Sequence, residues 1–304
     1  MATLIPVASF AAAPVARQVL PGLLLMMALL SSTGAHAAAP DTQADVGYQF
    51  DDNVARAKSG GMMLVDRSYS ANLSRPVIFP LAEHERIVLN GTLGAEVFDR
   101  YKGLSRLSET VHGEFQYRSS AEFGTPLFAL FARVMAEQYR SWLRDGIRYA
   151  AGVSLRQDIT DRIRLFAAAS HNVRHANSEV FDDKDNAARI NLDYATGYAD
   201  TLYLGGEYRR GETAISGSPA WSTYNYNAYT LDDAFPGAQV YSFQFDATTV
   251  LTTLGYNMKI GARGSLDFSW RRARSSVEYV TPSWGKATLS YVTNQYSLAY
   301  LVRF

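Results

Sequence analysis

The chain of 304 residues contains no cysteine. A disulfide framework and a thiolate metal site are therefore excluded. No excess of either charge is present, because 29 basic residues face 29 acidic ones, so the composition implies no nucleic acid or other polyanion as a partner. After the first forty residues there is also no continuous apolar run of the roughly 20 residues that a membrane-spanning helix needs. We predict neither a disulfide-stabilised module nor a helical inner-membrane protein.

Residues 1–37 have the pattern of a secretory signal peptide. Arg17 precedes an apolar run at 19–30, and Ala35-His36-Ala37 fits the small-x-small cleavage pattern. The run is short and is interrupted by Pro21 and Gly22. We expect residues 1–37 to be removed on export, residues 38–45 to form a short periplasmic lead, and residues 46–304 to form the folded domain.

The last nine residues, 296–304, show the pattern on which the fold prediction depends. Strand side chains alternate between two faces, so every second residue shares a face. One face of this segment is apolar and mostly aromatic, and it consists of Tyr296, Leu298, Tyr300, Val302 and Phe304. With its final aromatic residue, the segment resembles the terminal strand of Gram-negative outer-membrane β-barrels. That resemblance implies recognition of the strand by the barrel-assembly machinery, and surroundings of outer-membrane lipid and lipopolysaccharide.

The same alternation recurs through the rest of the chain. It predicts twelve amphipathic strands, at about residues 46–58, 62–79, 87–97, 110–118, 128–137, 147–156, 163–172, 190–194, 202–208, 241–250, 265–279 and 296–304. In the tenth, Tyr241, Phe243 and Phe245 are predicted to face outward, and a bulge is expected near Val250, where the parity changes.

Short and long connections alternate between these strands. The segments 80–86, 121–126, 157–162, 196–200 and 257–264 are short, whereas 175–186, 211–239 and 273–287 are long. Outer-membrane barrels have short periplasmic turns and longer external loops. We therefore predict an all-β, antiparallel, up-and-down transmembrane barrel of twelve strands. Fourteen strands would require a hairpin within 211–239, and ten would require strands two and three to be misassigned.

Three further stretches support a porin-like fold by resemblance. Residues 48–54, Tyr-Gln-Phe-Asp-Asp-Asn-Val, resemble the opening strand of porin-like outer-membrane barrels, including the barrel part of surface lipoprotein assembly modifiers. Residues 158–165 and 232–249 resemble parts of proteobacterial barrels of unassigned function.

Strand parity places many charged residues on the inner face. The predicted pore-lining residues are Glu96, Glu114, Arg118, Arg133, Glu137, Arg148, Arg156, Arg164, Asp193, Glu207, Arg209, Asp246, Asp267 and Arg271. Parity also places Asp51 and Arg189 on the inner face. Arg133, Arg148, Arg156 and Arg164 come from three consecutive strands, and we expect them to lie side by side. Either salt bridges hold this interior rigid, or an arginine strip lines a narrow pore that favours anions.

Candidate catalytic and metal-binding groups are few. His112 and Glu114 share a face, with Ser108 further along the same strand, but a nucleophile needs an adjacent base and an orienting group, and no His-x-Ser element is present. His171 and His175 share a face but lie about 13 Å apart by strand rise, too far to bind one metal ion. Residues 182–185 are predicted to be a solvated acidic loop.

The sequence therefore favours a small porin-like channel for hydrophilic, and in one interpretation anionic, solutes, with no cofactor and no metal. An outer-membrane scaffold or assembly component that binds a partner through its external loops is the alternative. A lipid-modifying barrel enzyme is the third candidate.

Overall fold

The computed structural model describes residues 42–58, 62–197, 199–217, 226–281 and 285–304, with the backbone alone at 278–281 and 285–288. The predicted signal peptide, the first part of the lead, the Ser59-Gly60-Gly61 turn and residues 218–225 of the predicted 211–239 loop lie outside these residues. The described strands are β1 (Gln43–Asp51), β2 (Asp66–Ala82), β3 (Glu85–Phe98), β4 (Arg106–Arg118), β5 (Leu127–Tyr139), β6 (Gly146–Asp158), β7 (Ile163–Ala176), β8 (Asp183–Ala195), β9 (Thr201–Gly217), β10 (Ala228–Leu231), β11 (Tyr241–Ile260), β12 (Gly264–Thr281) and β13 (Gly285–Arg303).

Three short 3-10 helices, η1 (Lys102–Leu104), η2 (Trp142–Arg144) and η3 (Glu179–Phe181), lie in the connections between strands. Across the described ranges no helix has the length and apolar character to cross a membrane.

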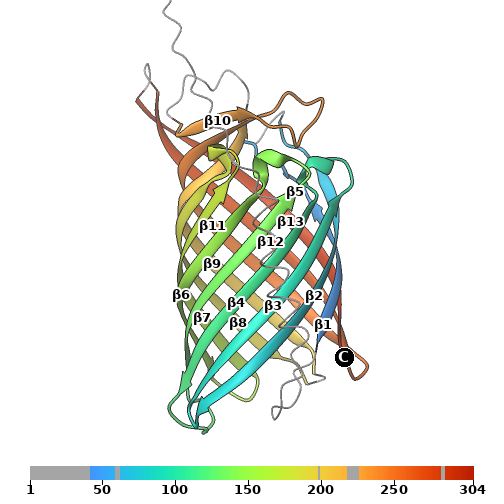
Figure 1. The fold of residues 1–304 in the computed structure, drawn as a ribbon, viewed down its shortest axis with the longest axis vertical. Coiled ribbons are helices and arrows are strands. Elements are labelled where there is room, and N and C mark those ends of the chain that lie inside the picture. Colours follow the sequence, from blue (N-terminus) through green and yellow to red (C-terminus); the bar gives the residue numbers. More distant parts are fainter. Residues whose placement is uncertain (1–41, 59–61, 198, 218–225, 282–284) are drawn as a thin grey trace, which may run out of the picture.

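The strands form one closed antiparallel barrel (Figure 1). Each wall strand pairs with its neighbour in sequence, β13 pairs with β1, and β11 pairs with β9. β10 pairs only with one end of β11 and takes no place in the wall. The prediction of twelve strands is therefore confirmed. β10 lies where a fourteen-stranded barrel would have required a hairpin.

The two ends of the barrel differ. At one end, here the turn end, the connections are short and residues 42 and 304 meet, since each backbone N–H donates to the other's carbonyl, at 3.0 and 2.9 Å. At the opposite end, here the loop end, lie the three 3-10 helices and β10 (Figure 1). In bacterial outer-membrane barrels the turn end faces the periplasm and the loop end faces outward.

The outer wall carries an apolar belt, as the alternation predicts. In β13, Tyr296, Leu298 and Tyr300 point outward and are 52%, 38% and 40% exposed. They pair across the closing seam with the outward-facing side of β1, where Val46 lies beside Tyr300. The terminal stripe therefore lies on the outer surface, and its recognition by assembly machinery stays a prediction.

The first strand is shorter than predicted. β1 ends at Asp51 rather than near residue 58, because the Asp51 carboxylate accepts the backbone N–H of Asn53 at 2.8 Å. The Asn53 side chain then donates to the carbonyl of Ala57 and accepts its N–H, at 2.8 and 2.9 Å. These local side-chain bonds compete with the ladder and turn the chain away from the wall.

The bulge predicted near Val250 is absent, because the pairing of β11 with β9 is unbroken from Tyr241 to Asn257. With continuous parity, Phe243 and Phe245 face inward and are buried, and Asp246 shares the outer face with Val250. The predictions of outward phenylalanines and of a pore-lining Asp246 are both wrong. The first residues of β11 pack beneath the loop-end segments, so their apolar side chains are buried on the inner face.

Two predicted long loops are shorter than predicted, because the flanking strands extend into them. β7 continues to Ala176 and β8 begins at Asp183, and β12 and β13 extend to Thr281 and from Gly285. Asp183 and Asp185 therefore lie on β8. Asp185 is buried and accepts a hydrogen bond from Asn172 at 2.8 Å, so the prediction of a solvated acidic loop is wrong.

Candidate functional site

Residues 226–240, named here the loop-end cover, lie across the loop end of the barrel (Figure 1). The cover leaves the wall at β11, which stands opposite β4 in the twelve-strand order. It reaches that far side, where a side chain added at Gly103 would meet Ala234. On the way, Asp232 forms an ion pair with Arg144 from the β5–β6 connection, at 2.5 Å.

Apolar packing holds the cover in place. Phe235, which is 2% exposed, packs edge-on against Tyr101 with ring centroids 5.2 Å apart. The cluster around it combines the cover with residues from the β1–β2 and β3–β4 connections: Val54, Ala55, Ala57, Leu104, Ala234 and Val240. The Arg144 guanidinium lies over the ring of Phe181, 4.0 Å from its centre, and 5.9 Å from that of Phe235.

A second apolar cluster lines the inner wall beneath the loop end. It contains Phe243 and Phe245 of β11 with Ile215, Ala247, Val277, Leu289 and Tyr291. The two clusters thus pack the loop-end cover and the neighbouring inner wall at the loop end.

A network of ion pairs surrounds Glu137, whose side chain is fully buried. Arg106 lies 2.6 Å and Arg174 lies 3.3 Å from its carboxylate, and Arg148 is more distant at 4.0 Å. Arg106 also pairs with Glu96 at 3.1 Å, and Arg148 with Asp183 at 3.2 Å. Buried charges are tolerated when they are paired in this way.

The lumen contains a series of polar cavities. One of about 610 Å³ lies next to the Glu137 network. Two others, of about 320 and 310 Å³, are both lined by residues of β8, β9 and β12. Residues of β1, β11 and β13 complete the lining of the first, and residues of β4 to β7 complete that of the second. Arg271 lines all three cavities, and Arg133 and Arg209 line two of them. These arginines therefore stand where the cavities meet.

Arginines from both sides of the barrel line the 310 Å³ cavity. They are Arg133 of β5, Arg189 of β8, Arg209 of β9 and Arg271 of β12. β5 and β12 are six strands apart in either direction around the wall, so Arg133 and Arg271 come from opposite sides. The arrangement can bind or guide anions.

The predicted strip of four adjacent arginines is not formed. Arg148 belongs to the Glu137 network near the loop end, whereas Arg156, eight residues further along β6, pairs with Leu127 near the turn end. Arg164 binds Asp158 at 2.7 Å at the turn end. Residues on consecutive strands lie at the same height along the barrel axis only if the strand register aligns them. The observed register places Arg148 at a different height from Arg156 and Arg164.

The other predicted lining residues are distributed along the lumen. Glu207 contacts Arg209 and lies 3.8 Å from Arg189, and Asp193 lines the 320 Å³ cavity. Asp267 accepts a hydrogen bond from the Tyr203 hydroxyl at 2.9 Å. Asp51, which ends β1, binds Arg56 at 2.9 Å.

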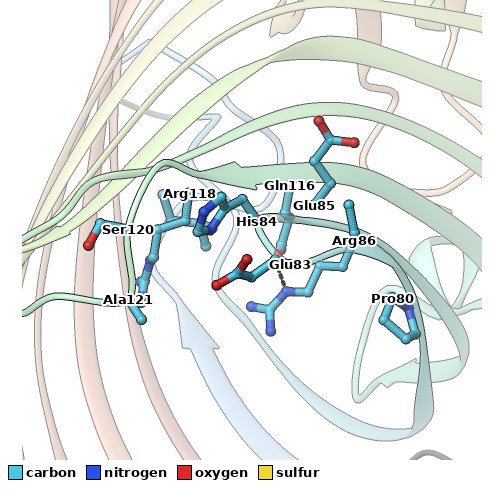
Figure 2. A pocket seen from close by; sticks show the side chains of 11 residues that line it. Pro80, Glu83, His84, Glu85, Arg86, Gln116, Arg118, Ser120 and Ala121 are labelled. Atoms are coloured by element: carbon cyan, nitrogen blue, oxygen red, sulfur yellow. Dashed lines mark hydrogen bonds between the residues drawn. The ribbon is translucent and has the colours of Figure 1, made fainter.

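Arg118 lies at the turn end, where it lines a cavity of about 280 Å³ between the β2–β3 and β4–β5 connections (Figure 2). In this cavity Arg86 donates to the Gln116 side chain at 2.7 Å, the dashed contact in Figure 2.

His112 and Glu114 are in contact, Nε2 to Oε1 at 2.9 Å, and the His112 ring lies 5.7 Å from that of Phe131. No hydroxyl of the described chain is hydrogen-bonded to His112, so the nucleophile of a hydrolytic site is not seen there. His171 lies on the outer face, bonded to Asn186 at 2.9 Å. Within the described ranges no three His, Asp or Glu residues gather as a metal site would require.

Several residues of the lumen were not predicted. Arg106 and Arg174 complete the Glu137 network, and Arg144 and Asp232 join the cover to the wall. Arg174 shares its parity with Arg164, so alternation could have identified it if strand seven had been extended. The Arg144–Asp232 pair joins residues 88 positions apart, and no local pattern signals it.

A closed antiparallel barrel with an apolar outer belt and a polar lumen defines a transmembrane β-barrel of the outer-membrane class. Among solved structures, the chain is similar to an outer membrane channel from Pseudomonas putida F1, with 12% identity, a TM-score of 0.58, and coverage of 90% of this chain and 98% of that one. This likeness shows the fold.

Lower scores are found with two porins. The KdgM porin in complex with disordered oligogalacturonate has 10% identity and a TM-score of 0.44, with 86% of this chain and 99% of that chain covered. The NanC porin has 11% identity and a TM-score of 0.43, with coverage of 86% and 100%. No family model and no curated protein sequence matches the chain.

Proposed function

We propose that the protein is a porin-like channel of the outer membrane for hydrophilic solutes, with a preference for anions. The arginine excess in the middle of the lumen carries this proposal. Within the described residues, neither Arg133 nor Arg271 has a carboxylate within 4.0 Å, although both line the cavities. Fixed charges in a confined path set the sign of the ions that pass.

The loop-end cover is the proposed gate of this channel. Because residues 226–240 cross the loop end, conduction through the whole barrel requires the cover to move aside. Its fixed points on the opposite wall are the Arg144–Asp232 ion pair and the packing of Phe235. The cover is therefore the gate of the proposed channel.

The proposal is tested by single-channel recording of the refolded protein in planar bilayers under a salt gradient. We expect conductance with a reversal potential on the anion-selective side. In the double variant Arg133→Glu/Arg271→Glu the reversal potential should move toward cation preference. At the narrow lumen these charges are poorly screened, because the gap to a passing ion is shorter than the roughly 8 Å screening length at physiological salt.

Arg272→Glu is the matched control, because Arg272 follows Arg271 directly but is exposed on the outer face of β12. It should leave the reversal potential unchanged. Absence of conductance in the wild-type protein, or an equal change in the control, would contradict the proposal.

A second candidate function rests on β10. Tyr229 and Leu231 are 52% and 54% exposed on this strand, at the loop end and outside the barrel wall. Exposed apolar residues in such a position suit a partner-binding scaffold. A wild-type protein that never conducts would favour this alternative.

A further inference from the structure

The 310 Å³ cavity in the middle of the lumen has a composition that goes beyond a general preference for anions. Four guanidinium groups line it, from Arg133, Arg189, Arg209 and Arg271, and they face two carboxylates, those of Glu114 and Glu207. Counting the arginines against the carboxylates alone, two positive charges remain uncompensated by the lining. An uncompensated charge in a confined aqueous space attracts a counter-ion from solution.

The carboxylates are already engaged. Glu207 contacts Arg209 and lies 3.8 Å from Arg189, so it serves both arginines of the β8–β9 wall. Glu114 is bonded to His112 at 2.9 Å and to Gln116. Arg133 and Arg271, which extend from opposite sides of the barrel, are the two arginines of this lining that have no carboxylate within 4.0 Å among the described residues.

Part of the lining of this cavity is small, which leaves open space beside its arginines. Ala168 lies directly beside Arg189 in the sheet, and Ala187 lies beside Arg209. Gly152 has no side chain, and the Phe131 ring occupies the place where one would be, since an added Cβ would lie 2.7 Å from it. Phe131 and Phe166 give the cavity an apolar surface, and Ser154 gives it a hydroxyl.

We propose that this cavity is a binding site for a small oxyanion that carries two or more negative charges, such as a di- or tricarboxylate or a pyrophosphate. The planar guanidinium presents paired N–H donors that match a carboxylate or phosphate. Two such groups from opposite walls can hold acidic groups at the two ends of one ligand. The inference deepens the proposed channel function by naming the class of solute that the channel holds.

Equilibrium dialysis of the refolded full chain in detergent tests the site, with radiolabelled citrate, pyrophosphate and acetate as probes. We expect citrate or pyrophosphate to bind saturably and acetate to bind far more weakly. Loss of one charge-assisted pair in Arg133→Gln or Arg271→Gln should weaken binding by about tenfold. The preferred probe shows whether carboxylate or phosphate is the natural chemistry.

Arg272→Gln is the control on the outer face and should bind as the wild type does. The two lumen variants stand on opposite walls, so the test remains decisive if one of them fails to refold, which its migration on unheated gels would reveal. Citrate and pyrophosphate binding no better than acetate, or equal weakening in Arg272→Gln, would overturn the site. Dialysis requires no conductance, so a protein that conducts without binding refutes this inference alone, and one that binds without conducting refutes the channel alone.

Discussion

Charged residues at the loop end and in the middle of the lumen are arranged in opposite ways. Near the loop end, Glu137 is fully buried and is surrounded by three arginines, one of which also binds Asp183. In the middle of the lumen, Arg189 remains 54% exposed, and Arg133 has no carboxylate within 4.0 Å among the described residues. The same residue type thus stabilises the loop end and leaves charge available further inside.

The difference follows from access to water. A charge taken out of water must be paired, because breaking a buried pair leaves a costly uncompensated charge. A charge that lines a hydrated cavity keeps its solvation and can exchange water for a ligand. Arginines in the ion pairs of the loop end therefore differ in role from the arginines that line the lumen cavities and that we propose contact solutes.

The largest expected effect lies outside both regions, at the C-terminal strand. Phe304→Asp should reduce assembled barrel in the outer membrane to near absence, because the charge replaces the final residue of the stripe that the assembly machinery is predicted to recognise. Deleting residues 233–238 of the loop-end cover should leave assembly largely intact. The measurement is heat-modifiable migration of the membrane fraction, and equal tolerance of both changes would show that the terminal stripe has no such role.

Next in size is the removal of the central carboxylate at the loop end. Glu137→Gln leaves Arg106 and Arg174 without their shared partner, and we expect a loss of about 3–5 kcal/mol in the free energy of unfolding. Arg133→Gln should change that free energy little, because no buried pair is broken. Urea unfolding of the refolded proteins measures both values, and similar losses in the two variants would remove the distinction between the regions.

Breaking the Arg144–Asp232 ion pair of the loop-end cover should lower the free energy of unfolding by less than Glu137→Gln does. It should also have a clear effect on the opening of the proposed channel. Arg144→Gln and Asp232→Asn break one contact, and for residues in contact a double-mutant cycle is expected to give a coupling energy of about 0.5–3 kcal/mol. The open fraction in single-channel records should increase in both variants. An unchanged open fraction would show that the cover is fixed by its apolar packing alone.

The smallest effect is expected at the turn end, where Asp200 accepts the backbone N–H of Lys259 and the Tyr256 hydroxyl, at 2.9 and 2.7 Å. These bonds, that of Lys259 first, lower the pKa of Asp200 below its usual 3.8. The stabilisation is therefore present above the unfolded-state pKa and is lost as the pH falls through the lower folded value.

Accordingly, the difference in melting temperature between the wild type and Asp200→Asn should be constant from roughly pH 7 to 5. It should shrink as the pH falls below the usual 3.8 and disappear once the pH has passed the lower folded-state pKa. A difference that grows on acidification would contradict the assigned contacts.

Much of the wall could be predicted from the sequence, and most of the site could not. Twelve strands and the outward stripe of β13 follow from alternation, because one face of each strand meets lipid. The same reasoning failed for Phe243, Phe245 and Asp246, since it assumed that apolar residues face outward along the whole of β11. That assumption does not hold for the loop-end part of β11, which lies beyond the lipid-facing belt. There the inner face packs beneath the loop-end cover and is apolar.

Residue type and parity determined that an all-β barrel forms and that arginines such as Arg133, Arg209 and Arg271 line its interior. Only the tertiary structure decided which of them are paired, because ion pairing depends on the heights at which strands are aligned and on segments that are distant in sequence. Arg148 and Arg156 share one strand and one face, yet the closed sheet places the first beside Glu137 and the second near the turn end. Alternation specifies the side of the wall for each residue, whereas register and loop packing determine its neighbours.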